Sequence, residues 1–335
     1  MQAQGPELEM MEDARDFADV RGQEHVKRAL EVAAAGGHHV LLVGPPGSGK
    51  SLLAQRLPSI LPPLSPAEAD ETNAIHSSAG LARPAPLVPP FQMPHHRSSP
   101  QAMLGEVREG TIHYGQVSLA HHGILCLDDL ALFAHEILVT LPSVLAGGRV
   151  ATRDPALTLP ATVTLVGSLQ PCACGYLGHL QLRCQCSPDE TVRYMVTVPA
   201  SLWDHFDLQV EVPAVRYRDI VDQSRCEPSE RIRARVERAR ERQRARFGDA
   251  PGRSTNGRMT RAQADKFCPV NAGGESLLRL AITRSALSGR GYLSVLRVAR
   301  TIADLDGSVE VTTAHFSEAI QYRSLQHLRI GDVRP

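Results

Sequence analysis

Residues 44–51 read Gly-Pro-Pro-Gly-Ser-Gly-Lys-Ser, a complete phosphate-binding loop of the form G-x-x-x-x-G-K-[ST]. The mostly aliphatic run at 39–43 predicts a buried strand, and a helical apolar pattern begins at Leu52. In this setting backbone N–H groups and the helix N-terminus point at a bound phosphate. The loop therefore predicts an α/β domain with a nucleotide ligand, which constrains the fold more than any other feature.

The loop also assigns chemical roles. We expect Lys50 to reach the β- and γ-phosphates and Ser51 to hold Mg²⁺. Hydrolysis also needs an acidic residue at the end of a second buried strand to help hold Mg²⁺, and Asp128 is at that position. The next residue, Asp129, is at the position that usually polarises the attacking water. The ligands expected are ATP and Mg²⁺. The residues expected to contact the nucleotide are Gly44, Pro45, Pro46, Gly47, Ser48, Gly49, Lys50, Ser51 and Leu52.

The composition limits the location and the partners. With 335 residues, 42% of them hydrophobic, the chain can form one large domain and a smaller one. Lys+Arg and Asp+Glu both number 36, so a global basic field is absent and any nucleic-acid surface must be local. The sequence shows neither a run of eighteen apolar residues nor a signal-peptide pattern, so we expect a cytoplasmic protein without membrane association.

Strand and helix patterns alternate up to about residue 213, which predicts a mostly parallel sheet. From about Ala214 only helical patterns remain. We therefore expect a flexible N-terminus (1–16), a P-loop domain (17–224) and a helical lid domain (225–335). Within the P-loop domain we expect a helix at 23–35, a long irregular proline-rich insertion at 61–101, a strand at 124–127, a helix at 134–146, a hairpin at 147–159, and strands at 162–168 and 208–212.

Several segments resemble the magnesium-chelatase-like AAA+ ATPases, in particular their YifB/ComM branch. The resemblance covers about residues 17–328. It rests on Phe17–Glu24, the loop at 44–51, Pro94–His96, Gly115–His121, Gly123–Leu130, Pro171–Tyr176, Cys184–Pro188, Arg297–Asp304 and Ala319–Ser324.

The resemblance implies a ring, commonly a hexamer, with ATP between subunits and an arginine finger supplied by the neighbour. ComM-type members are implicated in DNA branch migration, and chelatase relatives drive metal insertion into a porphyrin with partner subunits. The family's usual N-terminal Lon-like domain has no counterpart in this sequence, which starts close to the ATPase module.

The departures from the family pattern fall on residues expected to take part in ATP hydrolysis. Asp129 stands where the family has Glu, and its carboxylate is about 1–1.5 Å further from the water, which can cost about a hundredfold in rate. Gln170 replaces the sensor-1 Asn. His205 replaces the arginine finger, which can be worth about 10³–10⁵ in turnover. Arg290 matches the sensor-2 position, from which we expect it to reach the γ-phosphate. Binding should survive these changes, and hydrolysis should be weak.

Three functions stay open at this stage. The chain could be an active ATPase motor, because the loop, the Mg²⁺ acid and sensor 2 are in place. It could be a nucleotide-binding switch or structural subunit with little turnover. It could also be the motor subunit of a metal chelatase, which would need partner proteins.

Four cysteines, Cys172, Cys174, Cys184 and Cys186, form two C-x-C pairs separated by nine residues. They could hold one tetrahedral Zn²⁺, or they could be four reduced thiols in a loop, because disulfides are rare in the cytosol.

Histidines and arginines suggest further surfaces. For His95 and His96 a polar pore or interface role is favoured over a metal, and His121 and His122 are expected to be structural. Arg149 and Arg153, on the predicted hairpin, could contact DNA in a ring pore. An arginine-rich helix could be a solvated face with ion pairs or a nucleic-acid backbone contact; its arginines are Arg231, Arg233, Arg235, Arg238, Arg240, Arg242, Arg244 and Arg246.

Overall fold

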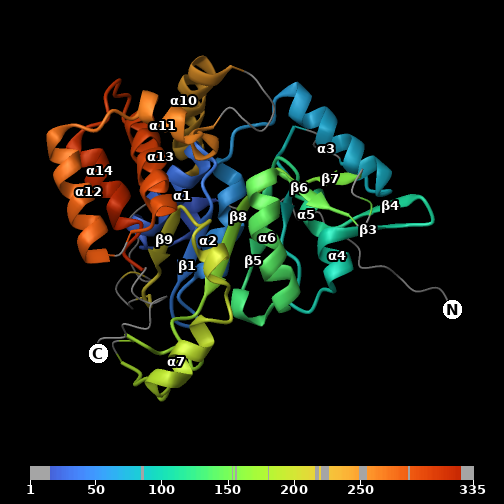
Figure 1. The fold of residues 1–335 in the computed structure, drawn as a ribbon, viewed down its shortest axis with the longest axis horizontal. Coiled ribbons are helices and arrows are strands. Elements are labelled where there is room, and N and C mark those ends of the chain that lie inside the picture. Colours follow the sequence, from blue (N-terminus) through green and yellow to red (C-terminus); the bar gives the residue numbers. More distant parts are fainter. Residues whose placement is uncertain are drawn as a thin grey trace.

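The computed structural model describes residues 16–83, 87–152, 154, 157–179, 181–215, 219, 226–248, 255–285 and 287–325. A parallel sheet with helices on both faces is followed by a helical region, which confirms the predicted fold class (Figure 1). Within the described residues, no helix is both long and apolar enough to cross a membrane.

Five strands form the central sheet in the order β2-β5-β8-β1-β9, and each neighbouring pair is parallel. Their aliphatic runs are almost entirely buried, as expected for a parallel sheet covered on both faces. All five carboxyl ends therefore lie along one edge. The strands are β1 (Val40–Val43), β2 (Phe91–Gln92), β5 (Ile124–Leu127), β8 (Thr164–Leu169) and β9 (Leu208–Glu211).

Alternate side chains of the sheet belong to two cores. Val40 and Leu42 pack into a core shared with α1 (Glu24–Gly36) and the C-terminal helices. Leu41 and Val43 pack into a second core with α6 (His135–Gly147). The helical region consists of α10 (Ser229–Phe247), η4 (Asn256–Arg258), α11 (Arg261–Phe267), α12 (Ala272–Ser285), α13 (Gly289–Leu305) and α14 (Thr313–Gln321).

Short elements complete the chain. They are η1 (Phe17–Asp19), α2 (Lys50–Arg56), η2 (Leu57–Ile60), α4 (Pro100–Leu104), α5 (Gln116–Leu119), η3 (Leu130–Leu132), α7 (Pro188–Met195) and α8 (Ala200–Trp203).

The sequence analysis expected an irregular insertion at 61–101, but the structure shows regular elements there. The insertion contains the thirteen-residue helix α3 (Pro66–Ser78), which begins at a capping box where the Ser65 and Glu68 side chains satisfy each other's backbone N–H groups. The prediction of an irregular segment followed from its many prolines and did not consider the capping box at Ser65 and Glu68. Proline at the first position of a helix costs nothing, because its missing N–H has no partner there anyway.

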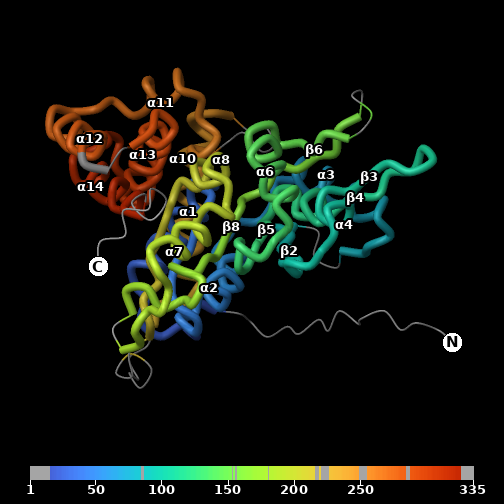
Figure 2. The backbone as a smooth tube through the Cα atoms, turned by 60° about the horizontal axis from the view of Figure 1, so that its bottom comes forward, coloured from blue at the N-terminus to red at the C-terminus, as the bar shows by residue number. Residues whose placement is uncertain are grey.

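Two hairpins project from the sheet domain. The first, β3 (Gly105–Arg108) with β4 (Thr111–Tyr114), was missing from the prediction. The second, β6 (Arg149–Ala151) with β7 (Thr158–Pro160), is the predicted hairpin. Arg153, which falls between these strands in the sequence, lies outside the described residues. Figure 2 shows both hairpins at the end of the molecule away from helices α12 to α14.

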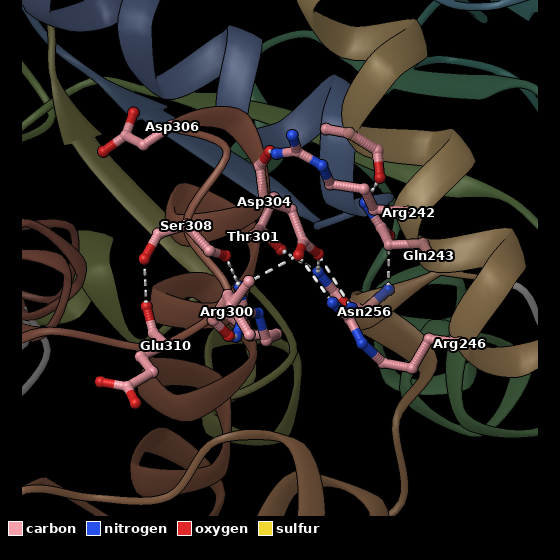
Figure 3. Close-up of polar contacts among 12 residues, drawn as sticks. Arg242, Gln243, Arg246, Asn256, Arg300, Thr301, Asp304, Asp306, Ser308 and Glu310 are labelled. Carbon is pink, nitrogen blue, oxygen red and sulfur yellow. Dashed lines mark hydrogen bonds and ion pairs between the residues drawn. The ribbon is translucent and has the colours of Figure 1, made fainter.

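The arginine-rich helix α10 has a structural role that neither sequence interpretation included. Figure 3 shows Asp304 of α13 in a polar cluster with Arg246 of α10. Arg246 donates to both Asp304 carboxylate oxygens at 2.9 and 2.7 Å, and Asn256 donates at 2.8 Å. Arg240 donates to the carbonyl of Ala34 at 2.8 Å. These arginines therefore tie α10 to α1 and α13.

Candidate functional site

The phosphate loop has the backbone that its sequence predicts. Gly47 and Gly49 adopt φ angles of +74° and +93°, which favour glycine, and nothing would lie within 4 Å of a Cβ atom at either position. Gly44 is needed for a different reason, since a Cβ there would lie 2.1 Å from the carbonyl oxygen of Val212 on the neighbouring strand segment. The loop is thus packed on the sheet at its start and open to a ligand at its tip.

Lys50 is held inside this loop. Its ammonium donates to the carbonyls of Gly44 and Pro45, each at 2.8 Å. Burial lowers its pKa, and the charges of Asp129 and Asp128 oppose that shift. A phosphate entering the loop would find a desolvated cation with three donors, a strong partner for an anion.

Ser51 and Asp128 meet at the start of α2, where the Ser51 hydroxyl donates to Asp128 Oδ2 at 2.7 Å. A hydroxyl and a carboxylate are the oxygen ligands with which P-loop proteins hold Mg²⁺, so this pair fits the ion. Ser168 at the end of β8 supports it: its hydroxyl donates to Asp128 and accepts from the Asp129 backbone N–H at 2.8 Å. The sequence analysis missed Ser168, whose signal was a polar residue inside a buried apolar strand.

Asp129 is the strained residue of the site. Its φ of +55° is unusual for a residue other than glycine and costs of order 1–3 kcal/mol. Burial, followed by the neighbouring charge of Asp128, raises its pKa, while Lys50, His96 and a hydrogen bond with the Gln170 side chain oppose the rise. The structure thus brings Asp129 and Gln170 together beside the phosphate loop. It also places His96 close by, which the sequence analysis did not foresee.

His205 and Arg290 lie together at the opposite edge of the sheet. His205 comes three residues before β9, whose first residue, Leu208, pairs with Val40 at the start of β1, whereas the phosphate loop follows the end of β1. The Arg290 Nη1 atom lies 3.1 and 3.3 Å from the two ring nitrogens of His205. The sequence analysis expected Arg290 to reach the γ-phosphate, but within one chain it lies away from the loop.

The His205 ring is held as a neutral imidazole. Its Nδ1 atom lies 2.8 Å from the carbonyl of Ser201, which assigns the proton to Nδ1 and leaves Nε2 to accept from Arg290. Burial, and then the charge of Arg290, lower the pKa of His205. Of this pair, Arg290 therefore carries the positive charge, and it is exposed at the start of α13. Beside it is a cavity of about 300 Å³ that Arg258 and Arg297 also line.

The four predicted cysteine ligands meet in one cluster, with sulfur atoms all within 4.8 Å of one another. Cys172 Sγ lies 3.4 Å from Cys174 Sγ and 3.7 Å from Cys184 Sγ. The remaining cysteines, Cys126, Cys226 and Cys268, lie outside the cluster.

The histidine pairs have local partners. His121 accepts from the Thr162 backbone N–H at 3.0 Å through Nδ1, and its Nε2 atom lies 3.2 Å from a Glu71 carboxylate oxygen. His122 contacts the same oxygen at 2.7 Å. The rings of His95 and His96 lie 4.1 Å apart. A pore or interface role for His95 and His96 stays a prediction.

Two family models match the chain. The model described as magnesium chelatase, subunit ChlI, matches residues 16–220, and the model of the C-terminal part of the same subunit matches residues 226–323.

Curated relatives match over nearly all of this chain. The uncharacterized protein YifB of Salmonella typhimurium is 38% identical over 94% of this chain and 62% of its own length. An uncharacterized protein of Mycobacterium tuberculosis is 39% identical over 93% of this chain and 62% of its own length. The competence protein ComM of Haemophilus influenzae is 34% identical over 93% and 61%, respectively. The chain thus spans less than two thirds of the length of these relatives.

Proposed function

The chain belongs to the magnesium chelatase family, and from this membership and the site geometry we propose that it is an AAA+ ATPase that binds ATP with Mg²⁺ and hydrolyses it slowly. The observation that carries the proposal is the 2.7 Å contact between Ser51 and Asp128 beside an open phosphate loop. It brings together the two residue types that hold Mg²⁺ in nucleotide hydrolases.

Each residue at this edge has a distinct task. Backbone N–H groups of residues 44–51 and the Lys50 ammonium bind the β- and γ-phosphates, and Ser51 and Asp128 would hold Mg²⁺, which neutralises phosphate charge when bound. Asp129 accepts a hydrogen bond from the attacking water, and the Gln170 amide orients that water and the γ-phosphate. The water oxygen bonds to phosphorus, the bond between phosphorus and the ADP oxygen breaks, one proton of the water is released to solvent, and ADP and inorganic phosphate leave.

Slow turnover follows from the shape of this edge. Asp129 has a shorter side chain than the Glu of the family pattern, and burial followed by the charge of Asp128 raises the pKa of its carboxyl group.

The opposite edge supports an assembly. Arg290 lies away from the phosphate loop of its own chain, so its charge is free to act on the nucleotide of a neighbour. A head-to-tail contact of this kind closes into a ring when the rotation between subunits allows it. We therefore propose a homo-oligomeric ring, by family resemblance a hexamer, in which Arg290 supplies the charge that His205 does not.

DNA is the proposed substrate of the motor, in single-stranded or branched form. The support is local: the β6–β7 hairpin projects from the sheet domain and carries the exposed Arg149. Since the chain has no net charge, such a contact must come from a small basic surface and should weaken steeply with salt.

Two alternatives make different predictions. A nucleotide-binding switch or structural subunit would bind ATP without turnover, an outcome that the His205 and Asp129 replacements favour. The motor subunit of a metal chelatase would hydrolyse ATP only with partner subunits, an outcome that the family membership favours.

A steady-state ATPase assay on the purified chain, with and without single-stranded DNA, separates these functions. We expect slow Mg²⁺-dependent turnover that the Lys50→Ala variant lacks. Nucleotide binding with turnover no higher than in that variant would reject the motor and leave the switch. Absence of DNA binding at low salt would remove DNA as the substrate.

A further inference from the structure

We propose that Cys172, Cys174, Cys184 and Cys186 bind one Zn²⁺ ion, and that this ion fixes the loop that supports the phosphate loop and Gln170. The site is separate from the proposed ATPase chemistry, because none of the four sulfurs belongs to the phosphate loop or to the acids of β5.

The spacing of the sulfurs is the first argument. A tetrahedral Zn²⁺ with bonds of about 2.3 Å separates its thiolates by about 3.8 Å. The sulfur contacts of the cluster measure 3.4, 3.5 and 3.7 Å. All four atoms lie within 4.8 Å of one another, which suits a single ion, since an iron–sulfur cluster would spread its thiolates over several metals.

A hydrogen bond to one of the sulfurs is the second argument. The backbone N–H of Cys174 donates to the Cys186 sulfur at 3.4 Å. Donors of this kind disperse the negative charge of metal-bound thiolates and fix their orientation.

The loop itself has little else to order it. The described part of residues 171–187 contains no helix or strand, and Leu182 in its second half is 49% exposed. An irregular segment of this length without an apolar core is commonly fixed by a metal. Helix α7 starts at Pro188, two residues after Cys186, so the ion would also anchor that helix.

Gly175 connects the cysteines to the nucleotide site. Gly175 directly follows Cys174, the second cysteine of the first pair, and its φ is +83°. A Cβ atom there would lie 2.6 Å from Pro46 Cδ and 2.7 Å from Gln170 Oε1. The loop therefore packs directly against both the phosphate loop and the sensor residue. Loss of the metal should loosen that support and weaken nucleotide binding.

Metal analysis of the purified full chain tests the site. We expect about one zinc per chain, and Co²⁺ exchanged into the wild-type protein should give the absorption of a tetrahedral tetrathiolate. The Cys184→Ser variant should lose the zinc, whereas Cys226→Ser, a matched change at a cysteine outside the cluster, should keep it. Absence of zinc together with absence of the cobalt spectrum would overturn the proposal, and so would iron in place of zinc. The cobalt spectrum needs no mutation, so misfolding of a variant cannot hide the answer.

The link to the nucleotide is tested separately with a fluorescent ATP analogue. Gly175→Ala keeps all four cysteines but adds a Cβ atom 2.6 Å from Pro46 Cδ, so we expect zinc to be retained and nucleotide binding to weaken about tenfold. Chelation of zinc from the wild-type protein should have a similar effect, reversed by added Zn²⁺. Unchanged affinity in both cases would refute the link. The metal analysis is carried out without nucleotide, so a failure of the ATPase proposal would leave the test of the zinc site unaffected.

Discussion

The two edges of the central sheet differ in completeness. At the carboxyl edge, the phosphate loop, Ser51, Asp128 and Asp129 lie together within a network of short hydrogen bonds. At the amino edge, Arg290 and the His205 ring contact each other beside a cavity, without a nucleotide-binding loop of their own. Under the proposed function, the carboxyl edge binds the nucleotide, and the amino edge acts on a nucleotide that a neighbouring chain holds.

Under the proposed function, the departures from the family pattern should have unequal consequences. Those at the carboxyl edge keep the residue class, with Asp129 for Glu and Gln170 for Asn, so we expect nucleotide binding to survive them. The replacement at the amino edge changes the class from a permanent cation to a neutral imidazole. The Arg290 guanidinium lies against that ring, and in the proposed ring assembly it would supply the missing charge.

The largest effect is expected from Lys50→Ala, which removes the buried ammonium from the carboxyl edge. Both ATP affinity and turnover should fall, with turnover lower by at least about a hundredfold. Equilibrium binding of a fluorescent ATP analogue and a phosphate-release assay measure the two quantities. Wild-type affinity in this variant would mean that the loop does not bind the phosphates.

Arg290→Ala tests the amino edge. Turnover in the assembled ring should fall about a hundredfold, because the charge facing the neighbour's nucleotide is lost. ATP affinity of the isolated chain should stay within about twofold of wild type, since Arg290 lies away from its own loop. Arg279→Ala, at an exposed arginine of α12, is the matched control and should change neither value. Weaker binding by isolated Arg290→Ala chains would indicate that both edges serve the same nucleotide.

The double change Asp129→Glu with His205→Arg sharpens the comparison in the opposite direction. It restores the missing methylene at one edge and the fork of donors at the other, so turnover should rise by about tenfold or more. Steady-state kinetics with each single variant beside the double variant separates the two contributions. No increase in an assembled ring would show that these positions do not limit hydrolysis.

The last effect concerns acid stability. Burial lowers the pKa of His39 at the amino edge to about 3, and its Nδ1 atom accepts from the Leu165 backbone N–H at 2.9 Å. The unfolded chain takes up this proton below about pH 6.5, so His39 should reduce the free energy of unfolding by about 1.4 kcal/mol per pH unit as the pH falls toward 3.

Urea unfolding at pH 7 and pH 5 checks this slope. His39→Asn keeps an acceptor for Leu165 and should make the loss of stability with falling pH shallower. His113→Gln, at an exposed histidine, is the control and should not. An unchanged slope in His39→Asn would refute the burial argument.

Local patterns explain what the sequence could predict. The phosphate loop, the strand before Asp128 and the helical C-terminal region follow from spacing and burial within short segments. Helix α3 was missed because its prolines were counted before its Ser65–Glu68 capping box. The positions of His96 and Arg290 depend on how distant segments meet, with Arg290 and His205 separated by 85 residues, and no local pattern carries that information.

A mixture of the Lys50→Ala and Arg290→Ala variants tests most directly whether one nucleotide site is divided between two chains. Each variant alone should be inactive, but random mixed rings place an intact phosphate loop against an intact Arg290 at about a quarter of their interfaces. Recovery of ATP turnover on mixing, at about that fraction of the wild-type rate, is the expected result. A mixture that stays as inactive as its components would contradict the division and return Arg290 to the nucleotide site of its own chain.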